Sequence, residues 1–280
     1  MHGTQRSRIS ISTPALGGLI TAAILLTASS VLFPVFPATA RVILVADANG
    51  DSAATRTALF AKPGPLIHYT FTAISADKQV KDVTGNGFDA TVNGTGTART
   101  EAGPHGGALV LDGQIYLVAA HPELLQMTSF TLSAWIKTDE LTGRFGILAK
   151  RTANMECPFV LAINNGGLEF DATDVDHAWS LNINSDPVLT SNQWTHVAAV
   201  VSAGKGVTLY ANGKKVGSLD SQKSVALNDE PLTIGFEAWG GADLSKGGDS
   251  GPVYLRGSIA DVQVFPRDLS PAEIAKLATQ

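Results

Sequence analysis

The sequence has little charge, a single cysteine and no basic stripe. Lys, Arg, Asp and Glu make up 16% of its 280 residues, and the formal net charge is −5. An acidic chain without clustered basic residues repels phosphates, so nucleic acid is excluded as an expected partner. Cys157 has no second cysteine to pair with, which rules out an intramolecular disulfide and leaves it as an expected small buried residue.

Hydrophobic residues and glycine, in contrast, are plentiful. Hydrophobic residues account for 44% of the chain, and it contains 28 glycines. That much apolar material suffices for a sizeable core without disulfides, and the glycines suit a fold with many turns.

The first 40 residues read as a targeting segment. Two arginines precede a long apolar stretch over residues 16–33, and Ala38 and Ala40 then provide the small residues of a cleavage site before Arg41. Residues 1–40 are therefore predicted to be a secretory signal peptide, which places the protein outside the cell, in the periplasm or in the cell envelope. The alternative is an uncleaved anchor, because the apolar stretch approaches the length of a membrane span, and only then is a membrane partner expected.

Residues 41–64 read as a linker, and residues 65–280 as one domain of short strands. Residues 130–137 alternate apolar with polar side chains, which predicts a strand with one buried face. Asn212 and Gly213 follow two apolar stretches as a type I′ hairpin turn. With a further strand predicted over residues 179–183, the spacing indicates an all-β, two-sheet antiparallel jelly-roll sandwich.

A short helix is expected at the C-terminal end of this sandwich. Ser270 is placed as its N-cap, Pro271 as its first residue, and Glu273 as the partner of a capping box.

Several segments together resemble one family, the laminin-G-like or concanavalin A-like lectin/glucanase jelly rolls. They follow in family order from residue 66 to the end: residues 67–71, 82–90, 108–113, 130–136, 194–216 and 255–270. The resemblance implies a two-sheet jelly roll with a concave face. It also implies a recognition domain rather than an enzyme, because only a minority of the family is catalytic.

The resemblance further implies a structural Ca²⁺ between the first glycine-rich loop and the closing strand. By position it points to Asp82, Asn86 and Asp261 as ligands. Calcium prefers six to eight oxygen ligands, and a loop rich in glycine can turn carbonyl groups toward one point. The alternative is that Asp82 and Asn86 only close a turn through hydrogen bonds from side chain to backbone.

Aromatic residues at loop edges are the candidate ligand-binding residues, because sugars stack their apolar faces on such rings. Trp179 next to His177, and Trp239 in the glycine-rich loop 237–251, are the residues expected to contact a glycan or a cell-surface ligand.

Two other functions stay open at this point. Glu169, Asp171 and Asp174 loosely resemble the catalytic strand of jelly-roll glucanases, although the last position is Asp rather than Glu. A polysaccharide-degrading enzyme that uses these residues is the first alternative, and a protein-binding adhesion module is the second. The interpretation preferred from the sequence is a secreted, non-catalytic binding domain stabilised by calcium.

Overall fold

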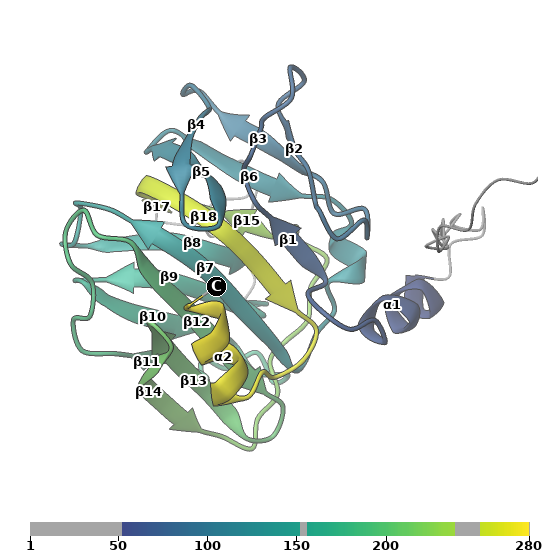
Figure 1. Cartoon of the computed structure of the whole chain (residues 1–280). Helices are drawn as coiled ribbons and strands as arrows, with labels where there is room; N and C mark the ends of the chain where they lie inside the picture. Colours follow the sequence, from purple (N-terminus) through teal and green to yellow (C-terminus); the bar gives the residue numbers. More distant parts are fainter. Residues whose placement is uncertain (1–51, 152–155, 239–252, 280) are drawn as a thin grey trace, which may run out of the picture. The chain divides into compact units, whose positions relative to one another are not determined.

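Figure 1 shows the computed structural model of the chain, which describes residues 52–151, 156–238 and 253–279. The described strands form two antiparallel sheets of eight strands each and one separate pair. Side chains from both sheets share one hydrophobic cluster, so the sheets pack face to face. This arrangement confirms the predicted all-β, two-sheet sandwich.

Sheet A contains the longest strands. Its order is β14-β13-β12-β7-β18-β5-β4, and β1 also pairs with β18. The strands are β1 (Ile67–Tyr69), β4 (Arg99–Gly103), β5 (Gly106–Asp112), β7 (Phe130–Lys137), β12 (Thr195–Ser202), β13 (Gly206–Ala211), β14 (Lys214–Asp220) and β18 (Arg256–Phe265).

Sheet B lies on the other side of the core, in the order β11-β10-β9-β8-β15-β6-β3-β2. Its strands are β2 (Gln79–Val80), β3 (Ala90–Gly94), β6 (Ile115–Ala119), β8 (Arg144–Lys150), β9 (Phe159–Asn164), β10 (Gly167–Asp171), β11 (Ile183–Asn184) and β15 (Thr233–Ile234). The separate pair is β16 (Phe236–Glu237) with β17 (Val253–Tyr254).

The alternating strand patterns account for the core. In β7, Leu132, Ala134 and Ile136 belong to the shared cluster, whereas Ser133 and Lys137 face away from it. The turn at Asn212 and Gly213 has φ angles of 47° and 75°, as a type I′ hairpin requires.

The helices lie at the two ends of the described chain. The helix α2 (Pro271–Leu277) begins at Ser270, and the capping box with Glu273 is present as predicted. The other helix, α1 (Ser52–Phe60), contacts the short 3-10 helix η1 (Pro122–Leu124) and buries Leu59. Part of the segment predicted as a linker is therefore helical, and an apolar residue ties it to the domain. No helix in the described part of the chain is both long and apolar enough for a membrane span.

The strand predicted over residues 179–183 was largely wrong. Only an isolated bridge from Thr173 to Trp179 and the two residues of β11 pair there. Between them, the Leu181 N–H donates to the Ala172 carbonyl at 3.4 Å, and side chains supply the other contacts. The Ser180 hydroxyl donates to Asp174 at 2.7 Å, and the Asn182 amide oxygen accepts from the Ala172 N–H at 3.3 Å.

Candidate functional site

The outer face of sheet B, the one turned away from the core, carries the candidate residues Glu169 and Asp171 of β10. Residues directly opposite one another on neighbouring strands point to the same face, so the register lines them up in rows. One row crosses seven of the eight strands, from β2 to β10, through Gln79, Thr91, Val118, Thr233, Ala149, Val160 and Asp171. The face therefore has a polar end at β2 and a charged end at β10.

The charged end is a cluster of ion pairs around Arg144. Its guanidinium contacts Glu169 at 3.0 Å and Asp171 at 2.8 Å, and it also pairs with Glu237. Arg151 pairs with the second oxygen of Glu237. A planar guanidinium offers five donors in a fixed arrangement, so Arg144 can bind three carboxylates at once.

Burial shapes the protonation of this cluster. The Glu237 side chain is only 2% exposed. Burial, with the neighbouring Glu169 adding to it, raises the pKa of Asp171 to about 6. Burial also raises the pKa of the nearby Cys157 thiol to about 12, so this thiol stays protonated and unreactive.

The three carboxylates that resemble a glucanase strand do not converge. Asp174 instead closes its own loop, where it accepts from the N–H groups of Asp176 at 2.8 Å and Ala178 at 3.1 Å. The Ser180 hydroxyl is the main cause that lowers the pKa of Asp174 to about 2, and Lys223 adds an ion pair at 3.3 Å. Glu237, which the sequence did not suggest, takes the third place beside Glu169 and Asp171.

The predicted ligand-binding residues are only partly on this face. Trp179 is half-buried, and its ring lies 5.2 Å from the Arg151 guanidinium, over a small apolar cluster with Cys157. His177 is exposed in the preceding turn and has a φ of 60°. Trp239 lies outside the described residues.

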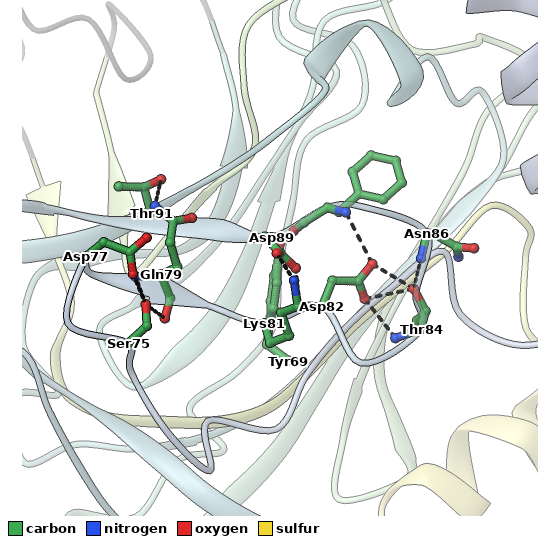
Figure 2. A network of polar contacts seen from close by, with 11 residues as sticks. Tyr69, Ser75, Asp77, Gln79, Lys81, Asp82, Thr84, Asn86, Asp89 and Thr91 are labelled. Atoms are coloured by element: carbon green, nitrogen blue, oxygen red, sulfur yellow. Dashed lines mark hydrogen bonds and ion pairs between the residues drawn. The ribbon is translucent and has the colours of Figure 1, made fainter. Parts of the chain in front are cut away.

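The predicted calcium residues gather around β1, and each has protein partners there. Asp82 is 3% exposed and accepts from the N–H groups of His68 at 3.1 Å and Thr84 at 3.1 Å. Its other oxygen accepts from the Thr84 hydroxyl at 2.7 Å and the Phe88 N–H at 3.3 Å. Figure 2 shows this turn, in which the carboxylate points at Thr84.

Asn86 and Asp261 complete the group. The Asn86 amide donates to the Leu66 carbonyl at 2.9 Å, and its oxygen accepts from Lys62 at 2.7 Å. Asp261 contacts the His68 ring at 2.6 Å, so His68 joins Asp82 and Asp261 through its backbone and its ring.

These contacts match a hydrogen-bonded turn, and they account for the burial of Asp82 without a cation. N–H and ammonium donors occupy the positions around the oxygens that a Ca²⁺ would need. Within the described residues, no three His, Cys, Asp or Glu side chains are grouped to hold a metal ion. The arrangement does not show a formed cation site, and calcium binding stays a prediction.

The opposite end of the outer face of sheet B contains a pocket of about 460 Å³. Gln79 of β2, Thr91 and Asn93 of β3, and Tyr116 and Val118 of β6 line it. The register explains the grouping, because Thr91 lies opposite both Gln79 and Val118, and Asn93 lies opposite Tyr116. Nothing in the sequence singles out these residues, which come from three short strands.

The strand β16 separates the pocket from the charged cluster. Phe236 stacks on Tyr116 with ring centroids 4.2 Å apart, and the next residue, Glu237, binds Arg144 and Arg151. A Cβ atom added to Gly146 of β8 would lie 2.7 Å from the Glu237 backbone nitrogen. This glycine therefore allows β16 to pass directly over β8.

These features define a lectin-like jelly roll with a structured outer face on sheet B. A family model described as Concanavalin A-like lectin/glucanases superfamily (Laminin_G_3) matches residues 111–275, and the chain belongs to this family. No curated protein matches the chain.

Solved structures agree on the fold. The chain is similar to domain 4 of AbnA, a GH43 extracellular arabinanase from Geobacillus stearothermophilus in complex with arabinotriose, with a TM-score of 0.57 and 21% identity over 76% of this chain and 97% of that one. It is also similar to the binding domain of Paraclostridial Mosquitocidal Protein 1, with a TM-score of 0.57 and 17% identity over 77% of this chain and 52% of that one. The receptor binding domain of botulinum neurotoxin type G is similar with a TM-score of 0.54 and 13% identity, over 77% of this chain and 51% of that one. The chain spans about half of each toxin domain, and identities this low show the fold alone.

Proposed function

We propose that this chain is a secreted, non-catalytic domain that binds a carbohydrate or a cell-surface ligand. The observation that carries the proposal is the state of the carboxylates on the outer face of sheet B. Glu169, Asp171 and Glu237 are all held by Arg144, and Asp174 is engaged in its own loop. A retaining glycosidase instead needs two carboxyl groups about 5–5.5 Å apart that face the scissile bond.

The similar structures support binding as the function. The arabinanase domain was solved with arabinotriose, and the two toxin domains are binding domains by name. The proposal that the protein is secreted rests on residues 1–40, which resemble a signal peptide and lie outside the described residues.

Glycan hydrolysis is the second candidate, and one observation favours it. The pKa of Asp171, raised to about 6 by burial and by Glu169, would suit a general acid near neutral pH. For an enzyme of this kind, the release of reducing ends would depend on Glu169.

The ligand test is a glycan array followed by titration, with arabinotriose as the first probe. We expect binding without release of reducing ends from arabinan, glucan or galactan, both for the wild type and for Glu169→Gln. Trp179→Ala should weaken binding about tenfold, or ~1.4 kcal/mol, because the ring offers a stacking surface beside Arg151.

The matched control is Trp194→Ala, because Trp194 is also half-buried but lies beside Lys137 of sheet A, at 5.0 Å. It should leave the affinity unchanged. Turnover that disappears in Glu169→Gln would establish the enzyme, and capture of a protein with no glycan bound would favour the adhesion module.

Calcium stabilisation is part of the proposal and has its own test. It is supported by the placement of Asp82, Asn86 and Asp261 around one short strand. A ligand that binds only the folded state adds about 2.7 kcal/mol at 100 times its Kd, so Ca²⁺ should raise the melting temperature and EDTA should reverse the increase. Asp82→Asn should reduce this response, because it removes the charge but keeps an oxygen acceptor for the turn.

Asp112→Asn is the control for the calcium test. Asp112 also accepts backbone N–H groups in a turn, from Gln114 at 2.9 Å and Thr97 at 3.2 Å, but it is not among the predicted ligands. A wild-type melting curve that neither Ca²⁺ nor EDTA shifts would contradict the calcium site.

A further inference from the structure

The pocket at the β2 end of sheet B has the size and the chemistry of a small binding site. Its volume of about 460 Å³ lies within the range of small-molecule pockets. It lies on the same outer face as Trp179 and the Arg144 cluster, but at the far end of the row of cross-strand neighbours. The sequence motifs assign it no role.

The polar wall of the pocket offers amide and hydroxyl groups that are already positioned. The Gln79 amide donates to the Thr91 hydroxyl at 2.9 Å, and the Asn93 amide donates to the Thr91 carbonyl at 3.0 Å. Figure 2 shows Gln79 and Thr91 side by side. No donor among the described residues contacts the amide oxygen of Gln79 or Asn93, so both oxygens remain available as acceptors.

The floor of the pocket is apolar and well supported. Val118 and Tyr116 of β6 form part of it, because both point to the outer face of the sheet. Phe236 stacks on the Tyr116 ring at 4.2 Å, and Tyr254 meets its edge at 6.1 Å. Phe236 and Tyr254 also fill the side of the pocket toward β8, so only a short ligand fits.

The charge of the pocket disfavours anionic ligands. No Lys, Arg or His is among the described residues that line it. Its carboxylate, Asp89, is held by Lys81 and by the Asp82 N–H at 3.0 Å, as Figure 2 shows. A phosphate, sulfate or uronate would therefore meet the Asp89 carboxylate, and the one cation beside it, Lys81, is already paired with that carboxylate.

We infer that this pocket binds one or two units of a neutral sugar, with Gln79 and Asn93 contacting its hydroxyl groups and the Val118 floor contacting its C–H face. This inference rests on the proposed function and names its ligand class. Hydroxyl groups both donate and accept, and side-chain amides do the same, so the two match. A neutral sugar has the combination of an apolar face and a polar rim that the pocket presents.

The test is calorimetric titration of the full mature chain with four neutral trisaccharides: arabinotriose, xylotriose, cellotriose and mannotriose. A trisaccharide of galacturonic acid serves as the anionic comparison. We expect at least one neutral probe to bind and the anionic one to bind more weakly. Gln79→Ala and Asn93→Ala should each weaken binding roughly three- to tenfold, because each removes a hydrogen-bonding group.

Two further variants separate binding from folding. Thr91→Phe fills the pocket from a half-buried strand position that tolerates aromatic residues. Combined with Trp179→Ala, it should abolish the remaining sugar binding with little further change in melting temperature. Asn184→Ala alters an exposed amide on β11, at the other end of sheet B, and should bind as the wild type does.

The outcomes separate this inference from the proposed function. If Thr91→Phe and Asn93→Ala leave neutral sugar binding intact, the pocket is not the binding site, but the proposed binding function is not contradicted. Absence of binding by every neutral probe would overturn the pocket inference, whereas the glycan array would decide the wider function. Tighter binding of the acidic trisaccharide would contradict the ligand class.

Discussion

Arg144→Ala is expected to lower the free energy of unfolding by about 3 kcal/mol or more. The substitution removes the one guanidinium that contacts Glu169, Asp171 and Glu237, and the Glu237 side chain is only 2% exposed. In the variant, Glu169 and Asp171 lose their cation and Glu237 keeps only Arg151. These largely buried carboxylates then keep their desolvation cost with less positive charge to offset it. For a domain of this size the loss corresponds to about 6–12 °C in melting temperature, which a thermal or urea unfolding curve measures.

Two controls distinguish charge from packing. Arg256→Ala breaks a surface pair with Glu140, at 3.3 Å with both side chains exposed, and should cost at most about 1 kcal/mol. The loss of unfolding free energy in Arg144→Ala should also be smaller at acid pH, because protonated carboxyl groups no longer need a cation. A loss that is the same at neutral and acid pH would show that Arg144 stabilises the fold through packing alone.

The sequence predicted the parts of the fold that depend on local patterns. The alternation over residues 130–137 gave β7 with the same bounds, and Asn212 and Gly213 form the expected turn. The capping box of α2 was also predicted, because its contacts lie within three residues of Ser270. Each of these features is determined by neighbours in the chain.

The charged cluster could not be predicted, because its contacts are distant in sequence. Glu237 lies 93 residues from Arg144 and 86 from Arg151. The contacts depend on how β16 passes over β8, which the close approach at Gly146 allows. No spacing motif encodes such a crossing, so the sequence pointed to Asp174, the nearest carboxylate along the strand, instead of Glu237.

The predicted calcium residues show a different limit. Their positions in family motifs place Asp82 and Asp261 near β1, but the motifs carry no information on their partners. In the structure both carboxylates contact His68, one through its N–H and one through its ring. Such neighbours decide whether a carboxylate faces a cation or a hydrogen-bond donor, and the sequence does not reveal them.

The pH dependence of stability should contain two opposing contributions between about pH 6.5 and pH 4. Burial is the main cause that lowers the pKa of His196 from 6.5 to about 4, so its contribution is full above pH 6.5 and is lost as the pH falls toward 4. That loss amounts to about 3 kcal/mol. The pKa of Asp171 is raised from 3.8 to about 6, so its contribution is present at low pH and is lost as the pH rises through 6.

The two contributions partly cancel in the wild type, and single variants should reveal each of them. Asp171→Asn should lose stability steeply on acidification from pH 6.5 to 4, because the His196 contribution is then unopposed. His196→Gln should lose less stability than the wild type over this range, or gain stability. Its amide can still bond the Ser133 hydroxyl, which contacts the His196 ring at 2.9 Å in the wild type. Urea unfolding at several pH values measures both slopes. Equal slopes in the wild type and both variants would show that neither group changes its protonation on unfolding in this range, because linkage requires the slope to change when a shifted group is removed.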